Sequence, residues 1–205
     1  MRGRGLRIFS LCLMPLVLAL PAGCALVAPP EPPMVTSLLD EMPAQVPHKA
    51  RGRATLLVFT PQARPAVDTL QMAYAVRAHQ LAYFARNQWA ETPPQMLEPL
   101  LVRTLEATGA FSAVLTPPQT GSVTLGLRTE ILDLVQDFTQ DAPVLRLSLR
   151  AVLSDEAANR TIATREWTLR EAMPQKSPTA GVLAANQAIA RMLPELASFV
   201  LDHAP

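Results

Sequence analysis

Apolar and polar residues alternate along much of the chain, which is the pattern of strands that pack one face against a core. The clearest case is 145–153, where Leu145, Leu147 and Leu149 alternate with mostly polar residues. Alternation or a short apolar run predicts seven strands, over 54–60, 70–76, 81–86, 111–115, 123–135, 145–153 and 161–171. The last three follow one another through turns, which predicts an antiparallel meander.

The stretch 123–135 is longer than the other predicted strands. Its apolar residues Val123, Leu127, Ile131 and Val135 occupy odd-numbered positions, each four residues from the next. Even spacing along a strand places side chains on the same face. We therefore expect these residues to contribute to one side of the sheet.

Helical spacing replaces alternation after Thr92. Thr92 and Gln95 can form a capping box, and Pro93 suits the first helical position. Leucines then recur at helical spacing from 97 to 105, and Gly109 suits the end of the helix. These features predict an amphipathic helix that covers part of the sheet.

A second helix is predicted to begin at Ser177-Pro178, and Pro194 should kink it. Its apolar stripe runs from Val182 to Val200 with spacings of three and four residues. Together with seven strands, the two helices predict a single α+β domain over 54–203. We expect two layers, a largely antiparallel sheet and two main helices packed on one face.

Residues 1–23 have the composition of a bacterial secretion signal. Three arginines precede an apolar region at 8–20, and the small residues Ala22 and Gly23 precede Cys24. This arrangement resembles a lipobox, in which the cysteine is acylated and the chain is cut before it, although Pro21 stands where such sites usually have Leu. Two alternatives stay open: cleavage after Ala25, or an uncleaved anchor over the uncharged residues 8–28.

Residues 24–53 contain six prolines and no aromatic residue. Such a composition favours extended geometry and does not build a core. We interpret the segment as a Pro-rich tether that could be removed with little loss of stability. Its middle, 34–42, is more apolar and could fold against the domain.

Composition and motifs argue against several classes of function. Residues 24–205 hold 15 basic and 17 acidic residues, so no basic field would recruit nucleic acid. No histidine or cysteine cluster has metal-ligand spacing, no glycine-rich loop suits a phosphate, and no nucleophile motif is present. We therefore expect no catalytic residue, no metal and no cofactor, and predict that the protein is not an enzyme.

Charged residues on the predicted strands have two interpretations. The carboxylate pairs Glu130 with Asp133 and Asp155 with Glu156 are interpreted as solvated surface rather than as acid–base catalysts. Arg146 and Arg150 share the polar face of one strand. They form either a solvated face or a site for an acidic partner.

The aromatic residues are better candidates for function. Successive strand side chains point to opposite faces, so Tyr83 and Phe84 cannot both face the helices. An outward Phe84 beside Arg86 and Trp89 has the composition of an interface hot spot. Trp89 could instead pack at the start of the first helix, and Phe84 could lie under the 34–42 segment. We predict Phe84, Arg86 and Trp89 as partner-contact residues.

The order LLVFTP, MAYAV and LAYFARNQWAETPPQMLEPLLVRTLEATGAFSAV resembles the ABC-type transport auxiliary lipoproteins over about 56–201. These are paraquat-inducible-type lipoproteins that accompany MCE lipid transport systems. The resemblance implies an outer-membrane lipoprotein that faces the periplasm, is anchored through lipid on Cys24 and contacts a periplasmic MCE protein. It leaves a homo-oligomer open. The alternative is a periplasmic carrier that encloses a lipid or a small apolar ligand.

Overall fold

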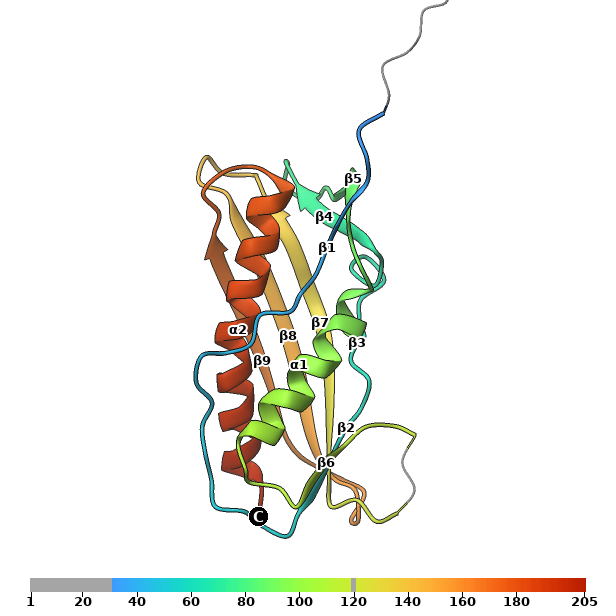
Figure 1. Cartoon of the computed structure of the whole chain (residues 1–205), viewed down its shortest axis with the longest axis vertical. Coiled ribbons are helices and arrows are strands. Elements are labelled where there is room, and N and C mark those ends of the chain that lie inside the picture. Colours follow the sequence, from blue (N-terminus) through green and yellow to red (C-terminus); the bar gives the residue numbers. More distant parts are fainter. Residues whose placement is uncertain (1–30, 119–120) are drawn as a thin grey trace, which may run out of the picture. The chain divides into compact units, whose positions relative to one another are not determined.

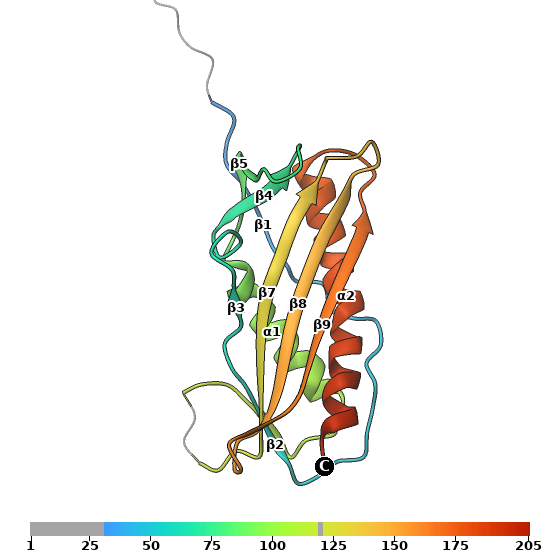
Figure 2. The same cartoon turned by 180° about the vertical axis from the view of Figure 1, so that it is seen from behind.

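The structure is a computed structural model that describes residues 31–118 and 121–205. Its compact unit is Pro32–Pro205. A sheet is covered on one face by two helices, α1 (Pro93–Ala107) and α2 (Pro178–His203), and the opposite face carries no helix (Figure 1, Figure 2). The predicted α+β class and the one-sided helices are confirmed. The predicted signal peptide and Cys24 lie outside the described residues.

Nine strands form the sheet within the described residues, two more than predicted. The seven predicted strands all occur, and the two additional ones, β1 and β3, are three and two residues long. In chain order the strands are β1 (Val35–Ser37), β2 (Thr55–Val58), β3 (Gln62–Ala63), β4 (Gln71–Ala75), β5 (Ala82–Trp89), β6 (Ala113–Leu115), β7 (Leu125–Asp137), β8 (Val144–Asp155) and β9 (Arg160–Ala172).

The sheet is mixed, which corrects the largely antiparallel arrangement that we expected. β7, β8 and β9 form the predicted antiparallel meander, and β4 and β5 form an antiparallel pair. On its other edge β7 pairs in parallel with β2, β3 and β4 in succession along its length. β2 also pairs in parallel with β6, and β5 with β1. Local patterns identify strands, whereas long connections decide these parallel pairings.

A bulge in β7 changes which residues face the helices. The register shifts between Ile131 and Asp133, so Ile131 lies opposite Leu149 and Leu134 lies opposite Leu147. An extra residue in one strand reverses the faces of every residue after it. Val135 therefore lies on the helix-free face, which corrects its expected grouping with Leu127 and Ile131.

The helices begin where the caps were predicted. The Thr92 N–H donates to Gln95 Oε1 at 3.0 Å, and the Ala180 N–H donates to the Ser177 hydroxyl at 3.3 Å. α2 is 26 residues long and continues through Pro194. Neither helix of the described ranges combines the length and the apolar content that crossing a bilayer requires.

The core lies between the helices and the covered face of the sheet. Its α1 side includes Leu97, Leu101 and Leu105, which are fully buried, and the predicted α2 stripe is buried from Ala185 to Val200. A close approach occurs at Gly181, where a Cβ would meet the buried amide of Gln136 on β7. Glycine at this position lets α2 lie against the strand.

The segment 32–53, which we predicted to be a tether, is part of the folded unit. β1 pairs with β5, and Leu39 is 3% exposed. The Asn186 side chain on α2 accepts hydrogen bonds from the Asp40 and Glu41 N–H groups at 2.9 and 3.0 Å and donates to the Leu38 carbonyl at 2.9 Å. The folded unit therefore begins near Pro32 rather than at 54. The Pro-rich composition of this segment does not predict a core, but backbone hydrogen bonds to β5 and α2 attach the segment to the domain.

Candidate functional site

The three predicted partner-contact residues lie in different environments on β5. Trp89 is 3% exposed and belongs to the core, so its ring is not an exposed anchor. Phe84 is half-buried, and Arg86 is exposed. A partner contact on β5 would therefore involve Phe84 and Arg86 rather than the Trp89 ring, and it stays a prediction.

Tyr83 and Phe84 point to opposite faces, as the alternation predicted. The Phe84 ring lies 4.4 Å from the Tyr74 ring and 6.4 Å from the Phe138 ring. The Tyr83 hydroxyl donates to the Ala66 carbonyl at 3.0 Å. Phe84 is thus part of an aromatic cluster that is half-buried at the end of the sheet, and Tyr83 ties β5 to the loop before β4.

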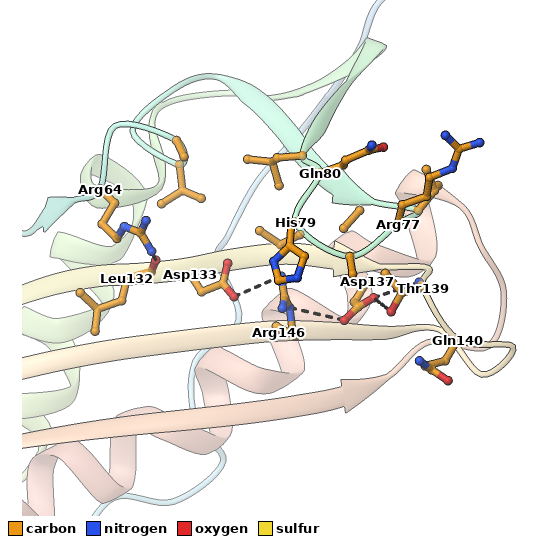
Figure 3. A pocket seen from close by; sticks show the side chains of 17 residues that line it. Arg64, Arg77, His79, Gln80, Leu132, Asp133, Asp137, Thr139, Gln140 and Arg146 are labelled. Carbon is orange, nitrogen blue, oxygen red and sulfur yellow. Dashed lines mark hydrogen bonds and ion pairs between the residues drawn. The ribbon is translucent and has the colours of Figure 1, made fainter.

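A surface pocket of about 780 Å³ lies on the helix-free face, beneath the turn between β4 and β5. Its lining comes from that turn, from the loop around Arg64, from the second half of β7 and from Arg146 on β8 (Figure 3). Val135 forms part of the pocket because the β7 bulge turns it to this side. His79 adopts a φ of 62° and projects from the turn toward the strands.

Ion pairs occupy the floor of this pocket. Arg146 lies between two carboxylates of β7, with its Nη2 3.4 Å from Asp133 Oδ2 and its Nε 3.6 Å from Asp137 Oδ2. Arg170 on β9 approaches Asp137 at 3.7 Å. The Arg146 Nε is buried and makes no hydrogen bond. These distances are long for charge-assisted hydrogen bonds, so polar groups of the floor are only partly satisfied.

The two carboxylates have opposite pKa shifts. Burial raises the pKa of Asp133 from its ordinary value of 3.8, and the nearby Arg146 and Arg64 charges oppose this only in part. Burial also acts on Asp137, but hydrogen bonds from the Thr139 hydroxyl and N–H, together with Arg146 and Arg170, outweigh it and lower the pKa of Asp137. The pocket thus combines one carboxylate whose charged form is disfavoured by desolvation with one whose charged form is stabilised.

Arg150 forms ion pairs with acidic residues of this chain, and an acidic partner molecule for the strand face stays a prediction. Its guanidinium donates to Glu130 at 3.4 Å and to Glu166 at 3.2 Å, on the neighbouring strands β7 and β9. Both acids belong to this chain and all three side chains are partly exposed. Ion pairs between neighbouring strands therefore occur along the helix-free face. Each contributes little stability, but they satisfy the charges of the face.

Sequence reasoning did not identify this pocket. Its residues come from four segments between 64 and 146, and each segment has an ordinary surface pattern. His79, Asp133 and Arg146 lie on three separate segments of the chain. The pairing of β4 and β8 with opposite edges of β7 brings them together, and no spacing in the sequence encodes that contact.

The pocket offers charged and apolar groups but no recognisable catalytic constellation. Within residues 31–118 and 121–205, no group of three or more His, Cys, Asp or Glu side chains could hold a metal ion. The carboxylates and arginines beside Val135 can bind the polar group of a ligand by charge. Val135 can contact the apolar part of the same ligand. This arrangement suits recognition of a ligand or a protein segment.

Comparisons with known proteins agree on the fold. A crystal structure of a Xanthomonas campestris protein matches with a TM-score of 0.73 at 22% identity, over 82% of this chain and 96% of that one. The crystal structure of an uncharacterized protein matches with a TM-score of 0.66 at 15% identity, over 82% of this chain and 99% of that one. At these identities the likeness concerns the fold alone. Among curated proteins, none matches the chain.

The family comparison extends over most of the domain. The model of the ABC-type transport auxiliary lipoprotein component matches residues 37–197. The match begins at the last residue of β1 and ends within α2, so it spans β2 to β9, α1 and most of α2. The protein therefore belongs to the ABC-type transport auxiliary lipoprotein family.

Proposed function

We propose that the protein is a lipid-anchored, periplasm-facing accessory component of an MCE-type ABC lipid transport system in the outer membrane. It acts by docking to a periplasmic MCE protein and carries out no bond chemistry. The family match over 37–197 is the observation that carries this proposal. The family is one of transport auxiliary components and is not a known enzyme family.

Cys24 is the proposed attachment site of the lipid. It follows Ala22 and Gly23 at the end of the apolar stretch, in a chain that belongs to a lipoprotein family. One acyl chain binds a bilayer only marginally, whereas two or more give stable anchoring. Anchoring would hold the domain at the membrane while its other surfaces stay available to the transporter.

The pocket beneath the β4–β5 turn is the observation that favours the alternative, a ligand carrier. Its volume of about 780 Å³ is within the range of small-molecule sites. Its floor, however, is formed by the ion pairs of Arg146, and a lipid tail would have to cover those charges. The helix-covered side is filled by the core, with Leu101, Leu149 and Leu193 fully buried. These features support docking over carriage of an apolar molecule.

Acylation is tested on the protein isolated from membranes. Intact-mass analysis should show a mature chain that begins at Cys24 and carries acyl groups, and Cys24→Ser should remove the protein from the membrane fraction. Separation of inner and outer membranes then tests the outer-membrane assignment. A mature chain that begins at Leu26 without lipid would refute the anchor.

Docking is tested at Arg86, since Phe84 also packs against Tyr74 and its truncation would lower stability. We expect Arg86→Glu to weaken capture of a periplasmic MCE protein, and the melting temperature of the variant, measured alongside, separates lost binding from lost folding. Arg103→Glu, which reverses a charge on exposed α1 surface, is the matched control. Equal capture by both variants and the wild type would exclude Arg86 from the interface.

A further inference from the structure

Exposed aliphatic side chains lie at both ends of the turn between β4 and β5, residues 76–81. Val76 is 53% exposed and Leu81 is 40% exposed. Met34 and Val35, just before and at the start of β1, are 54% and 48% exposed, and Val35 pairs with Asn87 in the second half of β5. Exposed apolar side chains gathered at one place commonly mark a surface that contacts protein or membrane.

The turn is free of negative charge. It contains Arg77 and His79, and no acidic residue occurs between Thr69 and Ala90. A basic side chain between exposed aliphatic ones is the composition of a surface that contacts anionic lipid headgroups. His79 adopts a φ of 62°, which tightens the turn and leaves Val76 and Leu81 on either side of it.

The direction of the N-terminal chain places this turn toward the proposed anchor. β1 runs parallel to β5, and β5 begins directly after the turn, so the chain before β1 comes from the end of the domain that carries the turn (Figure 1). Pro32 is only eight positions after Cys24. Fully extended, eight residues span about 28 Å at most. An acyl group on Cys24 therefore keeps this end of the domain near the bilayer.

We infer that the β4–β5 turn rests on the bilayer surface, with Val76 and Leu81 among the headgroups and Arg77 against anionic lipid. The inference rests on the proposed acylation of Cys24. It implies that the opposite end of the domain, where β2 and β6 lie, points away from the membrane. The turn also forms one wall of the pocket, so contact with the bilayer would place that pocket close to the lipid surface.

The experiment compares two leucines that are each 40% exposed. Leu70 directly precedes β4, and Leu81 ends the turn that follows β4. Each is replaced in the full chain, as Leu81→Cys and Leu70→Cys, and labelled with an environment-sensitive fluorophore. The acylated proteins are reconstituted on vesicles of phosphatidylethanolamine and phosphatidylglycerol that carry a bilayer-embedded quencher. We expect a blue-shifted, quenched emission at position 81 and neither effect at position 70.

The outcomes separate the inference from the function on which it rests. A chain that floats with the vesicles while position 81 stays as water-exposed as position 70 overturns the bilayer contact and leaves the anchor intact. Shielding of position 81 that is equal in detergent and rises with protein concentration assigns the turn to a second copy and also overturns it. An intact mass without acyl groups, whether the chain begins at Leu26 or keeps Cys12 and Cys24 as free thiols, shows that Cys24 is not acylated and removes the anchor and the inference together.

Discussion

Asp133 and Asp137 lie on the same strand and contact the same arginine, yet their pKa values shift in opposite directions. The difference comes from their neighbours. Asp137 accepts hydrogen bonds from the Thr139 N–H at 2.9 Å and the Thr139 hydroxyl at 2.6 Å, whereas only the Arg146 and Arg64 charges oppose the desolvation of the half-buried Asp133. Residue type and position alone would have made them equivalent.

This difference leads to a pH-dependent prediction for Asp137→Asn. We expect a loss of on the order of 1–3 kcal/mol in the free energy of unfolding at neutral pH, since hydrogen bonds to a charged group are lost. Because the folded pKa is lowered below 3.8, this stabilisation is fully present above 3.8 and disappears as the pH falls through the folded value. Urea unfolding of wild type and variant should therefore converge at low pH.

Asp133→Asn serves as the matched comparison. Its raised folded pKa means that the charged form costs stability above that pKa, and that the cost vanishes as the pH falls to 3.8. The asparagine removes the same cost at neutral pH, so Asp133→Asn should lose less stability there than Asp137→Asn. Equal losses for the two variants at every pH would contradict the assigned causes.

Among the structural elements, the segment before β2 depends most on tertiary contacts. It contains one strand of three residues, and α2 holds its backbone through the Asn186 amide. Lys49 further along donates to the Leu201 carbonyl at 3.0 Å, near the end of α2. Two contacts at separate turns of one helix thus fix an otherwise extended segment.

Asn186→Ala tests this arrangement. Three hydrogen bonds to the segment are lost, each of which contributes about 0.5–1.5 kcal/mol, so we expect a loss of roughly 2 kcal/mol in unfolding free energy. Amide hydrogen exchange of residues 38–41 should become faster. Gln187→Ala, at the exposed neighbouring position, should leave both quantities unchanged. Unchanged exchange in Asn186→Ala would show that β1 alone holds the segment.

At the scale of the whole molecule, the structure changes what truncation should do. Removal of residues 25–31 leaves the folded unit Pro32–Pro205 intact and should not alter the melting temperature. Removal of 25–53 takes away β1, the buried Leu39 and the hydrogen bonds to Asn186. We expect this longer truncation to lower the melting temperature by on the order of 10 °C.

Calorimetry on the two truncated proteins checks this expectation. The shorter truncation is the control for loss of chain length, since both lack the residues next to Cys24. Equal melting temperatures for the two would restore the interpretation of 32–53 as a removable tether. A lowered melting temperature in the shorter truncation would extend the folded unit toward the anchor.

The sequence by itself determined most elements of the fold. Alternation or a short apolar run located the seven predicted strands, and caps with helical spacing located both helices, because these patterns depend on neighbours within a few residues. The family resemblance also followed from such local spacings, and the match over 37–197 bears it out. Local order therefore needed no knowledge of the tertiary contacts.

Only the tertiary structure decided the parallel pairings, the bulge, the position of 32–53 and the pocket. β1 and β3 are too short to show a pattern, and they form because existing strands offer them hydrogen-bonding edges. The bulge moves Val135 to the helix-free face, where β4 and β8 bring Asp133, Asp137 and Arg146 beneath the turn. Each of these features depends on contacts between distant segments, and their free energy is set by the assembled sheet rather than by local spacing.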